Sequence, residues 1–213
     1  MLAARSMKGC PSGGISIWVS CRLNCKGEQV DVPLAMAPAN IQHVRLWAGR
    51  DKGGTMDILN VCIPPGWSLG VSDKTTSGNE RDGDMILVCG DFNTSACDAI
   101  NSSKIVIEDR SMGIPETAMS CPRSTKKAEA FTDLMFSNSL RFINDRSKSD
   151  GAVKANFDNG RSLSVIDYVI INVEAWPAVL DMAVVSRMES NHNPLAPNTA
   201  KCPRDRKHDK AGI

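Results

Sequence analysis

Met85-Ile86-Leu87-Val88-Cys89-Gly90-Asp91-Phe92-Asn93-Thr94 is an apolar run that ends in Gly-Asp-Phe-Asn, and it decides how the chain is interpreted. Short apolar runs bounded by polar segments are typical of buried strands. A carboxylate and an amide two residues apart at a strand end point to the same side of a sheet. The carboxylate can take a proton from water, and the amide can hold a phosphate oxygen. Taken alone, the stretch is explained equally well as an ordinary strand-to-turn junction.

Three further segments place polar residues on or beside apolar strands. The first, Ser164-Val165-Ile166-Asp167-Tyr168-Val169-Ile170, is an apolar strand with a single acid. The second, Glu189-Ser190-Asn191-His192-Asn193-Pro194-Leu195, follows the apolar stretch at 182–185. The third, residues 57–65, is a strand that must end at its two prolines.

An acid inside an apolar strand needs a partner if it is buried. A structural ion pair is one way to supply that partner. The other two histidines, His43 and His208, stand in no comparable context, and we expect both at the surface.

In order and residue type, these segments resemble the endonuclease/exonuclease/phosphatase superfamily of metal-dependent phosphodiesterases. The closer resemblance is to the endonuclease domain of LINE-type (non-LTR) retrotransposons. Residues 11–20 resemble the Gly-Gly strand of those domains, and residues 157–162 resemble their late loop. The resemblance covers roughly residues 10–195 and implies an α/β fold, a four-layer sandwich of two facing mixed sheets with outer helices. The site would lie at one rim, where strand ends converge.

The resemblance also implies roles for four catalytic residues. Asp91 would activate the attacking water, and Asn93 would hold that water or the phosphate. Asp167 would hydrogen-bond the ring of His192 and fix its tautomer, and His192 would stabilise the phosphate or donate a proton. The implied cofactor is Mg²⁺, with Mn²⁺ as the alternative, which polarises the scissile phosphate.

Two positions depart from the family pattern. Cys62 stands where the family has a tyrosine that contacts the phosphate, and a thiol is a shorter, poorer donor. Asn191 stands where the family has the aspartate of Ser-Asp-His, so it is at best a weak metal ligand. Because Mg²⁺ prefers charged oxygen ligands, we expect weakened metal binding.

The start of the chain is a third departure. The family places an asparagine and a metal-binding glutamate on two strands before the Gly-Gly strand, whereas only residues 1–9 precede Cys10. We expect a short leader at 1–9, a partial domain at 10–195 that lacks the N-terminal strands, and a basic, disordered tail at 196–213. Such a domain is expected to be marginally stable and to self-associate through exposed sheet edges.

Composition is that of one soluble domain. The chain has 213 residues, a length typical of one domain, and a formal net charge of +1. With so little net charge, DNA contact would depend on a local basic patch such as residues 201–210. The alternative is that this terminal charge run is simply solvated. Its eight cysteines form no zinc-type pairs, and without a secretion signal they are expected as thiols. No stretch reaches 18 apolar residues, so the expected location is intracellular, in nucleus or cytoplasm, and not in a membrane.

The remaining pattern gives a coarse secondary structure. We expect strands at 15–20, 44–47, 57–63, 85–91, 105–107, 140–143, 164–171 and 182–186, a helix at 126–139 and a surface loop at 71–84. Phe131, Leu134 and Met135 lie at helical spacing and are expected in the core, with Thr125 as a helix cap.

Two functions are consistent with these observations. The first is a Mg²⁺-dependent endonuclease that nicks DNA, with activity weak or lost, whose partner in the parent element is a reverse-transcriptase module. The alternative is an inactive retroelement relic or nucleic-acid-binding pseudoenzyme. A phosphatase or lipid phosphodiesterase on the same fold ranks third.

Overall fold

The computed structural model describes residues 17, 19, 25–32, 40–47, 54–64, 84–96, 103–116, 126–146, 155–158, 160–161, 163–185 and 190–199. The expected leader, the helix cap Thr125, nearly all of the 71–84 loop and residues 200–213 lie outside these ranges. Of the strand expected at 15–20, Ile17 and Val19 are described, and neither is in a strand.

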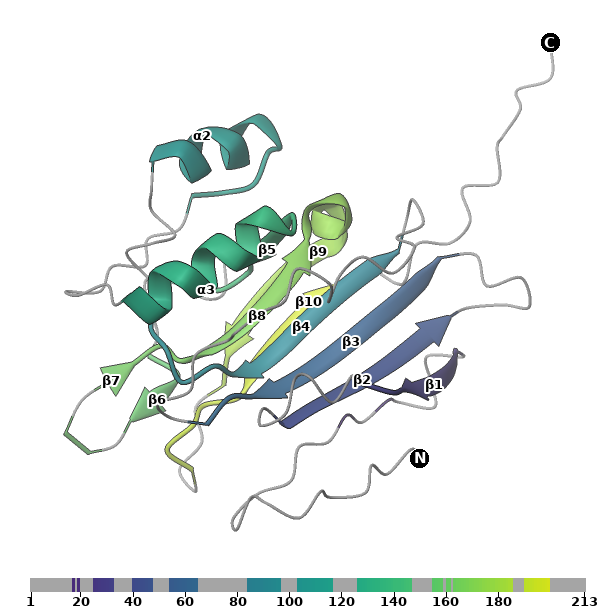
Figure 1. Cartoon of the computed structure of the whole chain (residues 1–213), viewed down its shortest axis with the longest axis horizontal. Helices are drawn as coiled ribbons and strands as arrows, with labels where there is room; N and C mark the ends of the chain where they lie inside the picture. Colours follow the sequence, from purple (N-terminus) through teal and green to yellow (C-terminus); the bar gives the residue numbers. More distant parts are fainter. Residues whose placement is uncertain are drawn as a thin grey trace.

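A six-stranded mixed sheet forms the body of the molecule (Figure 1). Its strands lie in the order β1-β2-β3-β4-β8-β5, and all neighbours are antiparallel except the parallel pair β3–β4. Their bounds are β1 Lys26–Val30, β2 Asn40–Trp47, β3 Thr55–Cys62, β4 Met85–Asp91, β8 Asp167–Asn172 and β5 Leu140–Phe142. The apolar run that opened the sequence analysis is therefore an interior strand, with hydrogen-bonded neighbours on both sides.

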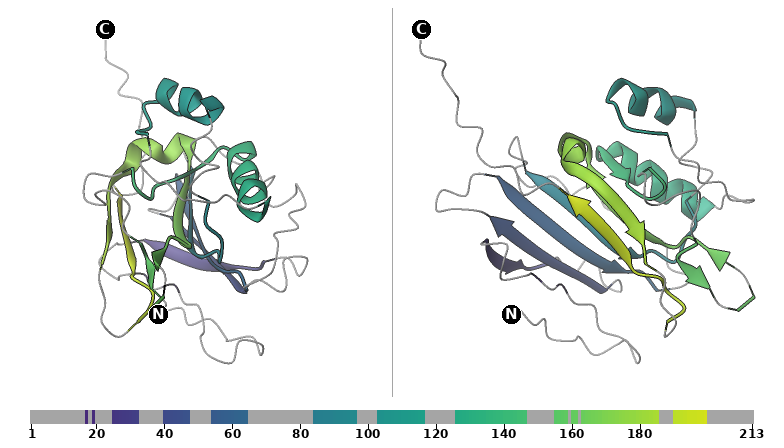
Figure 2. Two further views of the ribbon diagram at one scale, coloured as in Figure 1. Left: turned by 90° about the vertical axis from the view of Figure 1, so that its left-hand side faces the viewer. Right: turned by 180° about the vertical axis from the view of Figure 1, so that it is seen from behind.

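Both faces of this sheet are covered near β4 and β8 (Figure 2). Alternate residues of β8 belong to two different clusters: Tyr168 and Ile170 pack with helix α3 (Lys126–Ser137), and Val169 and Ile171 pack toward strand β9 (Val179–Val184). Strand β9 pairs with β10 (Leu195–Thr199) in a second sheet, and the 3₁₀ helix η3 (Val173–Ala178) joins β8 to β9. The facing sheets and the covering helix agree with the expected sandwich.

An aromatic cluster holds α3 on the sheet. Phe131 of α3 lies with its ring centroid 4.8 Å from Phe92, 5.5 Å from Phe142 and 5.9 Å from Tyr168. The buried Tyr168 hydroxyl donates to the Val165 carbonyl (2.9 Å) and accepts the Ala96 N–H (2.8 Å). These bonds fix the turn after β4 to the start of β8. The prediction that Phe131 and its helical neighbours form core is confirmed.

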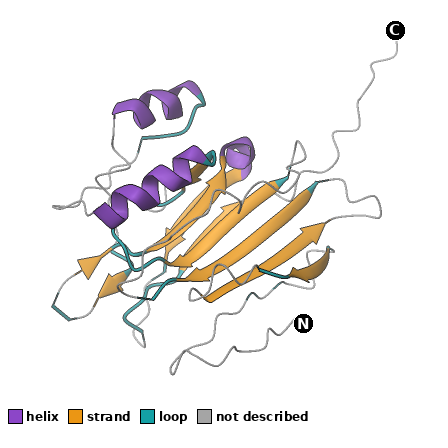
Figure 3. Cartoon of the chain, in the orientation of Figure 1, coloured by secondary structure: helices purple, strands orange, loops and turns teal. Residues whose placement is uncertain are grey.

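Helix α2 (Ser103–Ser111) corrects the strand expected at 105–107. Ile105, Val106 and Ile107 have high β-propensity, but the segment is helical and the side chain of Ile107 is 69% exposed. The helix instead buries Asp109, which accepts hydrogen bonds from Arg141 (2.6 Å) and Arg146 (2.5 Å). A long-range ion-pair network therefore outweighed local propensity. Figure 3 shows α2 and α3 gathered toward the β5 edge of the sheet.

Several other boundaries differ from expectation. The strand expected at 164–171 divides into β7 (Leu163–Ser164), which pairs with β6 (Phe157–Asp158), and β8, which begins at Asp167. The first residues of the expected tail, 196–199, belong to strand β10. Within the described ranges, Cys25, Cys62 and Cys89 form no disulfide, and no helix is long and apolar enough to cross a membrane.

Candidate functional site

The strand register brings two aspartates together at one end of the sheet. Asp91 is the last residue of β4, Asp167 is the first of β8, and the two stand directly opposite each other in the antiparallel ladder. Directly opposed residues project on the same face. By the alternation along β8, that face is the one covered by β9 and β10. Two carboxylates that are 76 positions apart in the sequence therefore become neighbours.

The Asp91 carboxylate is held by a turn that begins immediately after β4. Asn93 has a left-handed backbone, with φ of 46°, and its N–H donates to Asp91 Oδ1 (2.8 Å). Asn93 Nδ2 donates to Asp91 Oδ2 (2.9 Å) and to the Ile63 carbonyl (2.8 Å). The amide thus reaches the carboxylate because the chain turns back, and not because a strand continues through Asn93.

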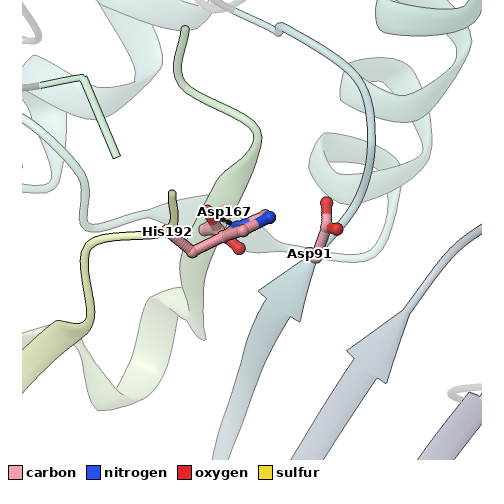
Figure 4. A group of neighbouring side chains, drawn as sticks. All are labelled: Asp91, Asp167 and His192. Atoms are coloured by element: carbon pink, nitrogen blue, oxygen red, sulfur yellow. Dashed lines mark hydrogen bonds and ion pairs between the residues drawn. The ribbon is translucent and has the colours of Figure 1, made fainter. Parts of the chain in front are cut away.

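His192 pairs with Asp167, as the sequence predicts. The distance from His192 Nδ1 to Asp167 Oδ2 is 3.0 Å. The imidazole ring packs on Phe157 with 4.7 Å between centroids, and a β-bridge joins the backbones of the same two residues. Figure 4 shows the ring lying beside Asp167 and extending toward Asp91. The segment before β10 therefore delivers the imidazole to the carboxylates.

Asp91, Asp167 and His192 together form a group able to hold a metal ion. One ligand atom from each lies within 4.8 Å of the others, and all three residues are part-buried. The two carboxylates suit Mg²⁺ or Mn²⁺, and Mg²⁺ in proteins is commonly held by one or two carboxylates plus water, whereas an imidazole nitrogen is a ligand for transition metals. Two facing carboxylates repel each other, so a cation between them is electrostatically favourable. The residues present fit a divalent metal.

The pKa of Asp167 reflects its burial and its closeness to Asp91. Burial raises the pKa of Asp167 to about 6, the hydrogen bond from His192 works in the opposite direction, and the nearby charge of Asp91 raises it further. The folded protein therefore holds a proton on Asp167 that the unfolded chain has lost between about pH 4 and pH 6. Because the folded-state pKa is the higher one, stability falls as pH rises through this window.

Asp167→Asn is expected to remove this pH dependence. Relative to the parent protein, the variant should gain on the order of 3 kcal/mol between pH 4 and pH 7, since a folded-state pKa of about 6 replaces the ordinary 3.8. Urea unfolding at several pH values measures the difference. Asp57→Asn is the matched control: burial alone would raise the pKa of Asp57, but hydrogen bonds from His43 and Arg45 hold it below its usual value. That variant should therefore lose relative stability over the same rise in pH, and equal slopes in the two variants would contradict the assignment.

Among known proteins, the chain is similar in fold to nucleases. No protein-family model matches it, and no curated protein is significantly similar in sequence. The endonuclease domain of TRAS1, a telomere-specific non-LTR retrotransposon, superimposes with a TM-score of 0.51 at 13% identity, over 83% of this chain and 80% of that one. The chain shares the fold of this endonuclease domain.

Two further structures superimpose with lower scores. A 3′-5′ exonuclease from Neisseria meningitidis has a TM-score of 0.49 at 14% identity, over 82% of this chain and 70% of its own. An AP endonuclease from Leishmania major has a TM-score of 0.47 at 13% identity, over 74% of this chain and 53% of its own.

Two buried asparagines hold the site residues in position, and the sequence analysis did not single them out. Asn156 is fully buried; its amide nitrogen donates to the Asp167 carbonyl (2.6 Å), and its oxygen accepts the N–H groups of Ile166 and Asp167. Its own carbonyl accepts the Asn193 N–H (2.7 Å). Asn144 donates to the same Asp167 carbonyl (3.1 Å). Asn156 thus ties the strand that carries one site residue to the segment that carries His192. Neither asparagine stands beside an apolar run ending in a recognisable motif, so the sequence carries no signal for this role.

The two residues that depart from the pattern described above, Cys62 and Asn191, differ in how they lie relative to the site. Cys62 ends β3 directly beside Asp91 in the parallel ladder, so the position is at the site even though its side chain is a thiol. Asn191 is exposed, and its backbone carbonyl accepts the Asp158 N–H (2.8 Å).

His43, expected at the surface, is instead part-buried on β2. Its Nε2 lies 2.8 Å from Asp57 Oδ1, and Arg45 donates to both oxygens of the same carboxylate. The expectation was wrong because β3 places an acid opposite this polar face of β2.

Proposed function

We propose that this chain is a metal-dependent phosphodiesterase that cleaves DNA, in the manner of a retroelement endonuclease. The observation that carries the proposal is the meeting of Asp91, Asp167 and His192 within 4.8 Å, where β4 ends and β8 begins. The fold is compatible with this function, since it is shared with the TRAS1 endonuclease domain, but a shared fold does not by itself assign chemistry. The side chains at the site therefore provide the argument.

Asp91 and Asp167 are the residues that would hold a divalent metal, with Mg²⁺ as the first choice and Mn²⁺ as the second. When bound, the metal polarises the phosphate and neutralises the charge that develops on it. Asn191 would at most assist, since it is an exposed neutral amide.

Each of the four site residues then has a defined role in the proposed reaction. Asp91 accepts a proton from the attacking water, and its orientation is fixed by two hydrogen bonds from Asn93. Because both amide hydrogens of Asn93 are donated within the protein, to Asp91 and to Ile63, its contribution is to aim the carboxylate. Asp167 accepts from His192 Nδ1, which leaves Nε2 to face the phosphate or the leaving oxygen.

A second candidate function is a nucleic-acid-binding protein that has lost catalysis. Cys62 favours it, because the position beside Asp91 carries a weak hydrogen-bond donor where the family has a tyrosine. The exposed amide at Asn191 favours it as well, because a neutral side chain adds no charge to the metal site.

Nicking of supercoiled plasmid separates the two functions. We expect the purified chain to nick in Mg²⁺ and not in EDTA, and His192→Ala to reduce the rate by about 10²-fold or more. His43→Ala is the matched control, because His43 also pairs with an aspartate but lies outside the group of three. Nicking that is equal in both variants would rule out the proposed site, and absence of nicking by a folded protein that binds DNA would favour the second function.

A further inference from the structure

Lys127, in the first turn of α3, reaches the turn that holds Asp91. Its Nζ donates to the Asn93 carbonyl at 3.0 Å, and its side chain is part-buried. Lys126, one residue earlier in the same turn, is exposed. Two adjacent lysines therefore have different surroundings, and only the second is directed to the site by a hydrogen bond.

The charge of Lys127 is coupled to the site. Burial lowers the pKa of Lys127, and the negative charge of Asp91 opposes that shift. The ammonium thus lies within electrostatic reach of the carboxylate that ends β4. A phosphodiester adds a further negative charge beside Asp91 and Asp167, and a nearby cation reduces that repulsion.

Two effects oppose this placement, although the bond to the Asn93 carbonyl and the charge of Asp91 favour it. A cation in the first turn of a helix is opposed by the positive end of the helix dipole, and partial burial of an ammonium is unfavourable as well. Residues that break a local preference in this way are expected at functional sites. An ammonium has three N–H donors, and the Asn93 carbonyl takes one of them.

We propose that Lys127 binds a non-bridging oxygen of the DNA phosphate that lies against Asp91. The inference rests on the proposed function for the choice of ligand, but it concerns binding and does not require cleavage. Lysine suits the task because it acts as a point charge on phosphate. Lys127 would hold the Asn93 carbonyl with one donor and the phosphate oxygen with another.

Binding of a fluorescent DNA duplex in EDTA, measured by anisotropy over a range of NaCl concentrations, tests the proposal without cleavage. Lys127→Met should weaken binding about fivefold to tenfold at 0.1 M salt and reduce the slope of log Kd against log salt by about one, as expected for one lost phosphate contact. Lys127→Arg should stay within about twofold of the parent, because it keeps the charge, and so should the matched control Lys126→Met. Equal losses in Lys126→Met and Lys127→Met, an unchanged Lys127→Met, or a parent protein that binds no DNA would each overturn it.

If Lys127→Met does not fold, the parent protein answers the question by NMR. On DNA titration, the side-chain ε-methylene signals of Lys127 should shift, and those of Lys126 should not. The reverse order would overturn the proposal. Plasmid nicking provides the independent comparison. Selective DNA binding through Lys127 without nicking would contradict the proposed activity alone. Nicking by the parent, with duplex binding that Lys127→Met leaves unchanged, would contradict the lysine's role alone.

Discussion

Asp91→Asn is expected to reduce phosphodiester cleavage by about 10²- to 10⁴-fold while leaving the protein folded. The carboxylate is one of three groups within 4.8 Å that could hold a metal, and it is the proposed acceptor of the water proton. An amide keeps the shape but has neither the charge nor the basicity. The measurement is kcat/KM on a fluorescent oligonucleotide in Mg²⁺, with thermal unfolding to confirm the fold.

Asp158→Asn is the appropriate control for this comparison. Asp158 lies on β6 near the segment that carries His192, but it is exposed, and its side chain accepts only the Gly160 N–H among the bonds described. We expect its kcat/KM to stay within about threefold of the parent, since a surface carboxylate is screened. A similar loss in both variants would show that net charge, and not the group around Asp91, controls the reaction.

Gly90→Ala is expected to destabilise the protein by about 4 kcal/mol or more, among the largest effects of any single substitution. Gly90 has φ of 137°, and a Cβ there would lie 1.9 Å from the Val61 carbonyl oxygen on β3. Because that atom is backbone within the parallel ladder, β3 and β4 would have to separate. Thermal unfolding should show a midpoint lowered by roughly 10 °C, or the variant should not fold.

Gly113→Ala separates the cost of a steric overlap from the cost of a left-handed backbone. Gly113 also has a positive φ, 71°, but no atom lies within 4 Å of a Cβ built there. We expect a cost of about 1–2 kcal/mol from the left-handed backbone alone. If both alanine variants unfolded at the same temperature, the close approach of β3 to Gly90 would not be the cause.

The elements that carry the site were predictable because their signals are local. The run that ends at Asp91 is apolar along its whole length, and a strand buried on both faces has that pattern. The run around Asp167 is similar, and an isolated acid in such a strand requires a partner, which the resemblance identified as His192. Motif order along the chain then predicted the fold.

What could not be predicted depends on contacts between distant segments. The strand expected at 105–107 is a helix because Asp109 pairs with two arginines more than 30 positions later. The burial of His43 depends on an acid on the next strand. Lys127 bonds to a carbonyl in a left-handed turn at Asn93, which the sequence alone did not specify. In each case tertiary structure overrides the local pattern.

Titration of the protein with Mn²⁺, followed by imidazole NMR signals, tests most directly whether a metal binds at Asp91 and Asp167, next to His192. The chain has only three histidines, His43, His192 and His208, so the spectrum is simple. The signals of His192 should broaden first, recover with EDTA, and require more Mn²⁺ in the Asp91→Asn variant. Equal broadening of His43 and His192, or a His192 signal that Asp91→Asn does not affect, would contradict a metal site where β4 ends and β8 begins.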